Sequence, residues 1–389
     1  MLYYANFKSK LQHSIQYSSH AGPSSLTGNL TRLLNNHLLS RFTYNIPPPP
    51  IHGESQHHPW KHIVDTHGME SQYLPNITNY TPRFFGESNV SIWHRLPVVR
   101  RSAVLVLLFL GKSGELRVVL TKRSRDLRSF SGHVSLPGGR ADTGLESEWM
   151  VARRETEEEI GISRYDRVNA ENGFSIEYVN MLPSYLSRTF LAVRPCVGFV
   201  KWAPEKLANP EDQHISSILL NPGESSSIFS VPLKDFLQPK PRRYELQECL
   251  KQSYVKTKWG GLPWNLRSYI FPLHNDNEVR WLSEVQDLSS EEEESQTDME
   301  LGEKTRDVWG LTANILRDLA EVAYCQRGDD LVIGEEELMH SLHEHGGQMS
   351  TKRRSDFETK MIAGAKGVKF GDVLEKKEFE RLKKIYSHI

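Results

Sequence analysis

The segment from residue 146 to residue 160 constrains this chain more than any other, because it gathers acidic side chains on one face of a helix. At about 100° per residue, Glu155, Glu158 and Glu159 fall within a sector of roughly 100°. Residues that can pack against a core lie nearly opposite, which predicts a helix with one buried side. The packing residues are Trp149, Ala152, Thr156 and Ile160. Gly161 follows at the position where helices commonly end.

The three carboxylates destabilise an isolated helix, since like charges at this spacing cost about 0.2–0.5 kcal/mol per pair. They also approach the helix C-terminus, where the helix dipole disfavours anions. A divalent cation compensates for both costs, and Mg²⁺ prefers oxygen ligands while leaving positions for substrate phosphate. A solvated acidic face is the alternative interpretation. The preceding Gly138-Gly139 favours the metal, because backbone without side chains can approach a phosphate or a metal closely.

The same segment resembles the Nudix box, usually written G-x5-E-x7-R-E-U-x-E-E-x-G-U with U apolar. Arg154-Glu155 and Glu158-Glu159 stand at its fixed positions, and Glu146 stands at its first Glu. Counted from Gly139, the loop has one extra residue, and Thr156 replaces an apolar residue.

The residues before the box resemble the signature of coenzyme A diphosphatases, L-L-T-x-R-[SA]-x3-R-x3-G-x3-F-P-G-G. The match runs from Val119 to Gly139, with Val119 in place of Leu and Leu136 in place of Phe. Arg123 and Arg128 stand at the two arginine positions. The extra loop residue is also a feature of this branch. The resemblance covers roughly residues 98–326.

This resemblance implies an α+β fold, a Nudix-type α/β/α sandwich with a mixed β-sheet. It implies hydrolysis of the diphosphate bond of coenzyme A or its derivatives to 3′,5′-ADP and 4′-phosphopantetheine, or acyl-phosphopantetheine. The implied cofactor is Mg²⁺, with Mn²⁺ as the other candidate. Glu155 and Glu159 are then the primary metal ligands, and Glu158 is a further ligand or a proton acceptor. All three are our candidate catalytic residues.

Roles for the remaining polar residues are less constrained by the resemblance. We expect Arg154 to orient the carboxylates by ion pairing, and Glu146 to be structural. Nudix enzymes differ in where the catalytic base lies, so that Glu211 and Glu224, in a distal loop, are further candidates.

A basic run precedes the double glycine, and it includes Lys122, Arg123 and Arg128. Arginine can bind a phosphate with two parallel hydrogen bonds, and lysine adds a point charge. We therefore expect these three residues, with Gly138 and Gly139, to bind the substrate. The alternative is a solvated strand edge, where lysine opposes aggregation.

Two other functions remain open. The first is a Nudix hydrolase that acts on another nucleoside diphosphate, such as ADP-ribose or NADH; the upstream signature argues against it. The second is a catalytically inactive Nudix module used for binding, with an acidic insert and a basic tail as its contacts. The intact Glu155, Glu158 and Glu159 argue against that interpretation.

We assign residues 98–326 to the Nudix domain, because strong hydrophobic patterning begins at about residue 98. Residues 1–95 form an N-terminal extension that we expect to be mostly irregular, with a helical pattern at 26–42. The domain contains an acidic insert at about 284–304, which we expect to be disordered because it carries four consecutive Glu. Residues 327–389 form a polar C-terminal extension.

Within the domain, hydrophobic patterning predicts four strands and one further helix. The strands are 103–110 and 116–121, joined as a hairpin, followed by 194–201 and 228–233. The further helix spans 307–324, with Trp309 among its apolar positions. Four histidines between residues 57 and 67 lack the fixed spacing of a metal site.

Composition excludes several classes of protein. Lys and Arg number 48 against 49 Asp and Glu, so that bulk charge indicates no nucleic-acid partner. The mean hydropathy is −0.52, and the longest apolar run, Ala103–Leu110, is far shorter than the ~20 residues of a membrane span. Three cysteines, Cys196, Cys249 and Cys325, form no disulfide framework and favour a reducing compartment.

The two ends of the chain suggest different compartments. No acidic residue precedes Glu54, a composition similar to a mitochondrial transit peptide. Ser387-His388-Ile389 resembles a diverged S-K-L signal, which a peroxisomal import receptor would bind. Because coenzyme A diphosphatases of this type are often peroxisomal, we expect the peroxisome, with the mitochondrion as the alternative.

Overall fold

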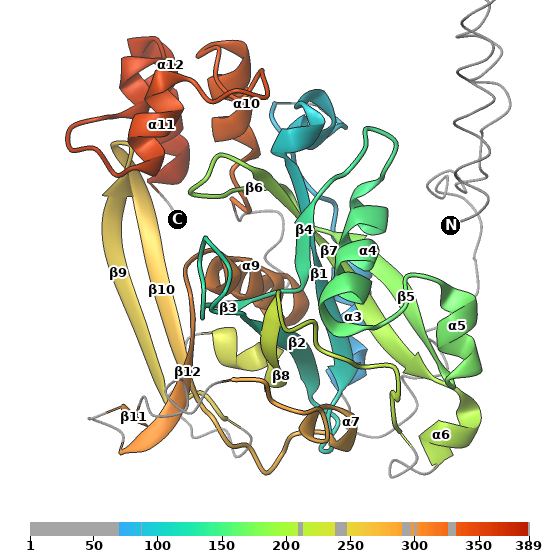
Figure 1. Cartoon of the computed structure of the whole chain (residues 1–389). Coiled ribbons are helices and arrows are strands. Elements are labelled where there is room, and N and C mark those ends of the chain that lie inside the picture. Colours follow the sequence, from blue (N-terminus) through green and yellow to red (C-terminus); the bar gives the residue numbers. More distant parts are fainter. Residues whose placement is uncertain are drawn as a thin grey trace, which may run out of the picture. The chain divides into compact units, whose positions relative to one another are not determined.

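A computed structural model describes most of the chain after residue 69 (Figure 1). The described residues are 70–86, 88–208, 213–237, 247–289, 297–298, 302–325 and 332–387. All of them belong to one compact unit, Pro59–Ile389. The helical pattern at 26–42, the histidines at 57–67 and Glu211 lie outside the described residues.

The centre of this unit is a mixed sheet in which β1 (Arg101–Leu110) runs parallel to β7 (Ala192–Trp202). Strand β1 also pairs antiparallel with β2 (Leu116–Arg123) and with β4 (Gly138–Arg140). The other strands are β3 (Val134–Ser135), β5 (Phe174–Met181), β6 (Tyr185–Leu186) and β8 (Ser225–Pro232). The four strands expected from the sequence are therefore confirmed, including the hairpin.

Alternation along β1 sends its side chains to two separate cores. Leu105, Leu107 and Phe109 join the core beneath α4 (Glu148–Ile160), and Val106 and Leu108 join the core beneath α9 (Gly310–Ala320). Figure 1 shows these two helices on opposite sides of the sheet. The predicted α/β/α sandwich with a mixed sheet is confirmed.

Helix α4 buries the side that the sequence predicts. Ala152, Thr156 and Ile160 are buried, and Ser147 caps the N-terminus by accepting a hydrogen bond from the Met150 backbone. The helix ends at Gly161, whose φ of 77° suits a left-handed cap. Its last carbonyls are not left unpaired, because Leu219 and Asn221 donate backbone hydrogen bonds to Ile160 and Glu159.

The helix expected at 307–324 begins later than predicted. Strand β12 (Glu303–Trp309) continues to Trp309, which pairs with Ser268 of the neighbouring strand. Gly310 then adopts a φ of 64° and turns the chain into α9. Trp309 therefore lies on a strand, and the prediction that it lies on the helix is wrong. After α9 the chain continues as a π-helical turn, Glu321–Cys325.

A second sheet, which the sequence analysis missed, is formed by the part of the chain that follows β8 and precedes α9 in the sequence. It contains β9 (Lys251–Trp259), β10 (Leu262–Pro272), β11 (Thr297–Asp298) and β12 in the order β11-β12-β10-β9. Strands β9 and β10 form a hairpin around Gly260-Gly261, both with positive φ. Strand β11 and the start of β12 fall inside the segment 284–304, so that its description as a disordered loop is wrong for those residues.

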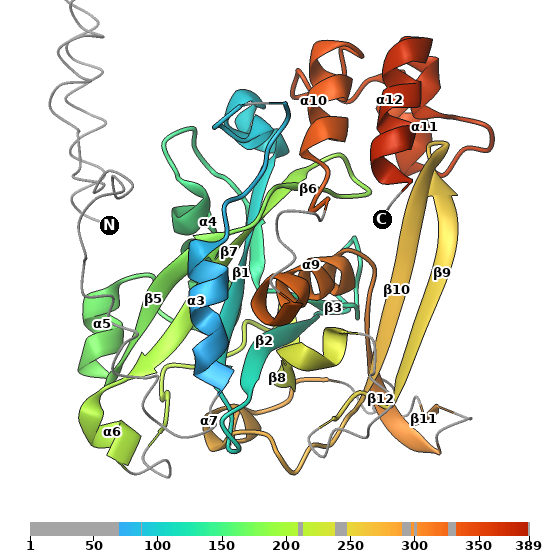
Figure 2. The same ribbon diagram turned by 180° about the vertical axis from the view of Figure 1, so that it is seen from behind.

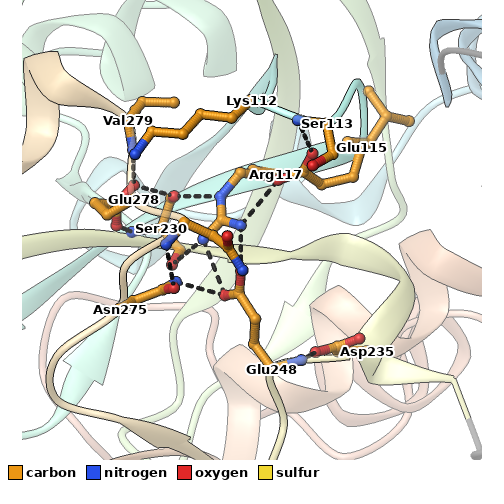
Figure 3. Close-up of polar contacts among 12 residues, drawn as sticks. Lys112, Ser113, Glu115, Arg117, Ser230, Asp235, Glu248, Asn275, Glu278 and Val279 are labelled. Atoms are coloured by element: carbon orange, nitrogen blue, oxygen red, sulfur yellow. Dashed lines mark hydrogen bonds and ion pairs between the residues drawn. The ribbon is translucent and has the colours of Figure 1, made fainter. Parts of the chain in front are cut away.

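A buried arginine fastens the central sheet to the start of this insertion (Figure 3). Arg117 of β2 donates hydrogen bonds to both carboxylate oxygens of Glu248, at 2.6 and 3.0 Å, and to Glu115 at 3.0 Å. It also donates to Ser230, which in turn donates to Glu278. One guanidinium thus bonds to acceptors from three separate segments. These bonds fix the point at which the chain leaves the central sheet and enters the second sheet.

Short helices complete the unit, and the segment before residue 95 is less irregular than expected. Helix α3 (Leu74–Asn79) and the 3₁₀ turn η3 (Ile92–Arg95) bury Leu74, Ile77 and Trp93. The remaining short elements are η2 (Glu70–Tyr73), η4 (Val98–Arg100), α5 (Asp166–Glu171), α6 (Pro204–Ala208), η6 (Leu233–Phe236), α7 (Arg280–Ser283) and η8 (Phe370–Asp372). Among the described helices, none is long and apolar enough to cross a bilayer.

The C-terminal residues pack as helices α10 (Glu336–Glu344), α11 (Asp356–Ile362) and α12 (Lys376–Tyr386). They contribute to the same core as α4 and lie beside the tip of the β9–β10 hairpin in both views (Figures 1 and 2). Two buried carboxylates anchor them. Glu336 accepts hydrogen bonds from the backbones of Ile92 and Ser184, and Glu358 pairs with Arg100 at 2.6 Å.

A third buried carboxylate predicts a pH dependence of stability. Burial raises the pKa of Glu335 to about 8 from an ordinary value of 4.5, although the Leu186 backbone donates to it at 2.8 Å. Its contribution to folding is complete below pH 4.5 and is lost as the pH rises to about 8, because only the unfolded chain ionises freely.

We therefore expect Glu335→Gln to become more stable relative to the wild type as the pH rises through this window. The difference in the free energy of unfolding between the variant and the wild type grows by up to about 1.4 kcal/mol per pH unit. Urea denaturation across the window measures it, with the exposed Glu380→Gln as the control. Parallel stability curves for wild type and Glu335→Gln contradict the prediction.

Candidate active site

Two glycines let β4 lie close to its neighbours, Gly138 to β1 and Gly139 to α4. A Cβ on Gly138 would stand 2.4 Å from the Ala103 carbonyl, and one on Gly139 would stand 2.3 Å from a carboxylate oxygen of Glu155. Gly138 also has a φ of 154°, which disfavours any side chain. The Ser102 hydroxyl donates to the Gly139 carbonyl at 2.5 Å and fixes the strand. The backbone of β4 and the carboxylates of α4 therefore meet directly.

Glu159 is the most deeply buried carboxylate of the acidic face, with 5% of its surface exposed. Burial raises its pKa to about 8; the Glu155 and Glu224 charges also raise it, whereas Arg123 and a hydrogen bond from the Gly138 backbone lower it. Among the described residues, its Oε2 atom has no hydrogen-bond partner. A buried carboxylate oxygen without a partner is costly unless another group binds it.

Glu155 lies one turn before Glu159 and is half-buried. Burial raises its pKa, the charges of Glu158 and Glu224 add to that rise, and the Arg154 guanidinium opposes it. Glu224 approaches from the loop before β8, where its backbone accepts a hydrogen bond from Ser124 at 2.9 Å. Its Oε2 atom is also buried without a partner in the described structure. Three carboxylates thus repel one another here.

Arg154 is the hydrogen-bond donor that three of the acidic residues share. It donates to Glu146 at 2.8 Å, to Glu155 at 2.9 Å, to Glu158 at 3.2 Å and to the Arg140 carbonyl at 2.7 Å. These bonds raise its pKa further above the ordinary value. Glu146 receives two backbone hydrogen bonds as well, from Asp142 and Thr143, which suits the structural role expected for it.

Glu158 occupies a different environment from its two neighbours. Its side chain is 43% exposed and pairs with Arg154 and, at 3.6 Å, with Arg164. The cavity beside Glu155 and Glu159 does not include it among its lining residues. The three carboxylates that the sequence places on one helical face are therefore separated, because Arg154 holds Glu158 on the outer side.

A cavity of about 680 Å³ opens at Glu155, Glu159 and Glu224. It also contains Arg123, Gly138 and Gly139 of the expected substrate-binding residues. Lys122 and Arg128 do not line it; Lys122 is half-buried and Arg128 is exposed. A volume in this range is typical of sites for small molecules.

The far wall of the cavity comes from parts of the chain to which the sequence analysis gave no function. Strands β9 and β10 contribute Trp259 and Trp264, the end of β12 contributes Trp309, and α11 contributes Met361. The Gly-Gly turn between two runs of β-forming residues is the signal that could have revealed the hairpin. Nothing in the sequence indicates that this hairpin faces the acidic helix.

The carboxylates of the cavity suit a divalent cation that shares its ligands with a substrate. In the described residues, no group of three or more His, Cys, Asp or Glu side chains is arranged to hold a metal ion by itself. Two buried, unpartnered oxygens, on Glu159 and Glu224, nevertheless belong to the cavity. Mg²⁺ commonly binds one or two carboxylates and completes its shell with water and substrate phosphate. The donor set fits that type of shared site.

Comparisons with known proteins agree with the sequence signature. The family described as NUDIX domain matches residues 99–251. Peroxisomal coenzyme A diphosphatase 1 of Saccharomyces cerevisiae is 41% identical over 321 residues, which cover 78% of this chain and 92% of that protein. Nudix hydrolase 15, mitochondrial, of Arabidopsis thaliana is 32% identical over 58% of this chain and 59% of its own. Peroxisomal coenzyme A diphosphatase NUDT7 of Mus musculus is 30% identical over 36% and 49%.

The hydrogen bonds of Arg154 predict a large loss of stability when it is removed. We expect Arg154→Ala to lower the free energy of unfolding by about 3–5 kcal/mol, because Glu146 and Glu155 lose a buried partner. Arg154→Lys keeps the charge without the planar fork and should lose less. Urea denaturation measures both, with Arg167→Ala, whose side chain is 90% exposed, as the control. A loss no larger than that of the control contradicts the prediction.

Proposed function

The chain belongs to the Nudix hydrolase family, and on that premise we propose that it hydrolyses the diphosphate bond of coenzyme A or its derivatives. The products are 3′,5′-ADP and 4′-phosphopantetheine, or acyl-phosphopantetheine for an acylated substrate. The relative named as a coenzyme A diphosphatase that aligns over 92% of its length supports this substrate.

One observation carries the proposal: a single cavity contains Glu155, Glu159 and Glu224 together with Arg123. Nudix hydrolases generally need a divalent metal ion, and here we propose Mg²⁺, with Mn²⁺ able to replace it. Glu155 and Glu159 are the proposed ligands, since both reach the cavity and Glu159 has an oxygen without a partner in the described structure. When bound, the cation lowers the pKa of a water and neutralises charge on phosphoryl oxygens.

The chain's own residues orient the diphosphate. Arg123 lines the cavity with a buried Nε that has no partner among the described residues, so that it can donate to a phosphate oxygen. Gly138 and Gly139 also line the cavity, and we assign their backbone to the binding of the substrate. Arg128 and Lys122 lie outside the lining, and we assign them to the outer approach to the cavity.

For the proton acceptor we favour Glu224 over Glu158. Glu224 lines the cavity and has a buried oxygen without a described partner, whereas Glu158 is exposed and paired with Arg154. A general base has to lie within hydrogen-bond reach of the attacking water. Glu158 then acts by balancing Arg154, or as a ligand if that ion pair opens.

The direct test is a substrate panel with purified protein in Mg²⁺ and in EDTA. We expect hydrolysis of coenzyme A with release of 3′,5′-ADP, and no release in EDTA. Faster hydrolysis of ADP-ribose or NADH supports the other Nudix substrates. No metal-dependent hydrolysis of any diphosphate supports a binding module instead.

A single substitution tests the ligand assignment. We expect Glu159→Gln to lower kcat by at least about a hundredfold, because the amide cannot compensate a divalent charge, while the fold is retained. Stopped assays of 3′,5′-ADP release and circular dichroism check the two parts. Glu157→Gln is the matched control, since Glu157 pairs with Arg164 and Ser163 and does not line the cavity. Undiminished turnover in Glu159→Gln removes Glu159 from the site.

For localisation we propose the peroxisome, which the names of the yeast and mouse relatives indicate for those proteins, with the mitochondrion as the alternative that the plant relative suggests. His388 and Ile389 lie outside the described residues, so that the structure does not bear on the import signal. We expect a protein tagged at its N-terminus to coincide with a peroxisomal marker, and deletion of residues 387–389 to abolish this. Mitochondrial fluorescence of a C-terminally tagged protein supports the alternative.

A further inference from the structure

Three cationic side chains that line the cavity take no part in the arrangement described so far. They are Arg140, at the end of β4, Arg188, in the turn between β6 and β7, and Lys258, near the end of β9. In the described part of the chain, none of these three side chains donates a hydrogen bond or forms an ion pair. The carboxylates of Glu155 and Glu159 are not their partners.

Packing brings these cations to one region of the cavity. The rings of Phe190 and Trp259 lie 6.2 Å apart, which places the turn that holds Arg188 beside the strand that holds Lys258. A Cβ on Gly364, after α11, would stand 3.4 Å from the Arg188 guanidinium. Three separate segments thus meet around Arg188.

Arg140 lies at the border between this region and the carboxylates. It follows Gly139, which contacts Glu155, and its backbone carbonyl accepts a hydrogen bond from Arg154. Arg354 donates to the Thr189 carbonyl at 2.7 Å, in the same turn as Arg188. Burial lowers the pKa of Arg354, and the charges of Arg100 and Arg140 lower it further, so that Arg140 is close to this turn as well. The carboxylate near this turn is Glu358, which pairs with Arg100 and opposes the lowering of the Arg354 pKa, whereas Arg140 and Arg188 form no ion pair in the described part of the chain.

Unbalanced cations that face a cavity favour an anionic ligand, and the arrangement selects among anions. An arginine fork and a lysine ammonium suit a phosphate group, which presents several oxygens and close to two charges at neutral pH. The substrate proposed above carries one anionic group besides its diphosphate, namely the 3′-phosphate on the ribose.

We propose that Arg188 and Lys258 form a second anion subsite, which binds the 3′-phosphate of the substrate and thereby determines specificity. The subsite is separate from the diphosphate position at Glu155 and Glu159, and Arg140 lies between the two. This inference rests on the proposed function, because the 3′-phosphate belongs to coenzyme A. It assigns substrate recognition to a side chain of the β9–β10 hairpin, outside the matched family region.

The kinetic test compares coenzyme A with dephospho-coenzyme A, which lacks only the 3′-phosphate. We expect the wild type to prefer coenzyme A in kcat/KM. Arg188→Ala and Lys258→Ala should each lower kcat/KM for coenzyme A by about tenfold to a hundredfold, the usual range for a hydrogen bond to a charged group. Both should leave the value for dephospho-coenzyme A unchanged. Lys256→Ala is the matched control, since Lys256 is an exposed lysine on the same strand and does not line the cavity.

A binding test separates this inference from the proposed function. Calorimetry on the intact protein without metal should show tighter binding of adenosine 3′,5′-bisphosphate than of adenosine 5′-monophosphate, and the double variant should lose that difference. This result supports the subsite even if coenzyme A is not hydrolysed. Equal binding of the two nucleotides by the wild type overturns it, as does an equal loss of kcat/KM for both coenzymes in the variants.

Discussion

The contact between the backbone of Gly139 and the carboxylate of Glu155 sets the geometry on which the site depends. Strand β4 can lie this close to α4 because Gly139 has no side chain, and Gly138 in the same way lets β4 lie close to β1. The same closeness buries Glu159 beneath the strand, away from water, where the pKa of its carboxyl rises. The proposed cation site therefore depends on a packing constraint at Gly139. The helix dipole and the like charges would oppose it on an isolated helix.

The groups proposed to react and the groups that form the far wall of the cavity come from different parts of the chain. The central sheet and α4 supply the carboxylates and Arg123, whereas the second sheet and the C-terminal helices supply the far wall with Trp259, Trp264 and Met361. Buried ion pairs hold these additions in place: Arg117 with Glu248 at one root, and Arg100 with Glu358 at the other. Breaking such pairs costs far more than breaking surface pairs. The buried ion pairs therefore fix the position of the far wall, and with it the shape of the cavity.

The elements that the sequence predicted are those whose pattern is local and strong. Strand β1 is an uninterrupted apolar run, and α4 has a packable side, an N-cap and a terminal glycine. The second sheet escaped prediction because β9 is exposed along most of its length, so that no alternation of buried and solvent-facing residues marks it. Trp309 was assigned to a helix because an apolar residue beside a helical pattern fits its period; only the pairing with β10 shows that it belongs to a strand.

The candidate site shows the same limit at the level of single side chains. Helical geometry correctly places Glu155, Glu158 and Glu159 in one sector, but it does not say which neighbours stand opposite each of them. Arg154 turns Glu158 outward, and the loop after residue 219, which docks on the last carbonyls of α4, brings Glu224 inward. The second outcome depends on a contact between segments that are distant in sequence, and the first depends on which neighbours the Arg154 side chain bonds within its own helix. Periodicity alone could therefore not separate the exposed carboxylate from the buried ones.

The charges of the cavity suggest that binding of the diphosphate depends on binding of the metal ion. A diphosphate that approached Glu155, Glu159 and Glu224 without a cation would meet three carboxylates, two of them with buried oxygens that no described donor satisfies. Without a cation the charges of Glu155 and Glu224 oppose the diphosphate, while burial favours the protonated form of Glu159 by raising the pKa of that carboxyl to about 8. Arg188 and Lys258 of the proposed subsite form no ion pair with these carboxylates in the described part of the chain. We therefore expect productive binding of a diphosphate at α4 to depend on a divalent cation, whereas binding of a nucleotide phosphate at the proposed subsite near Arg188 should not.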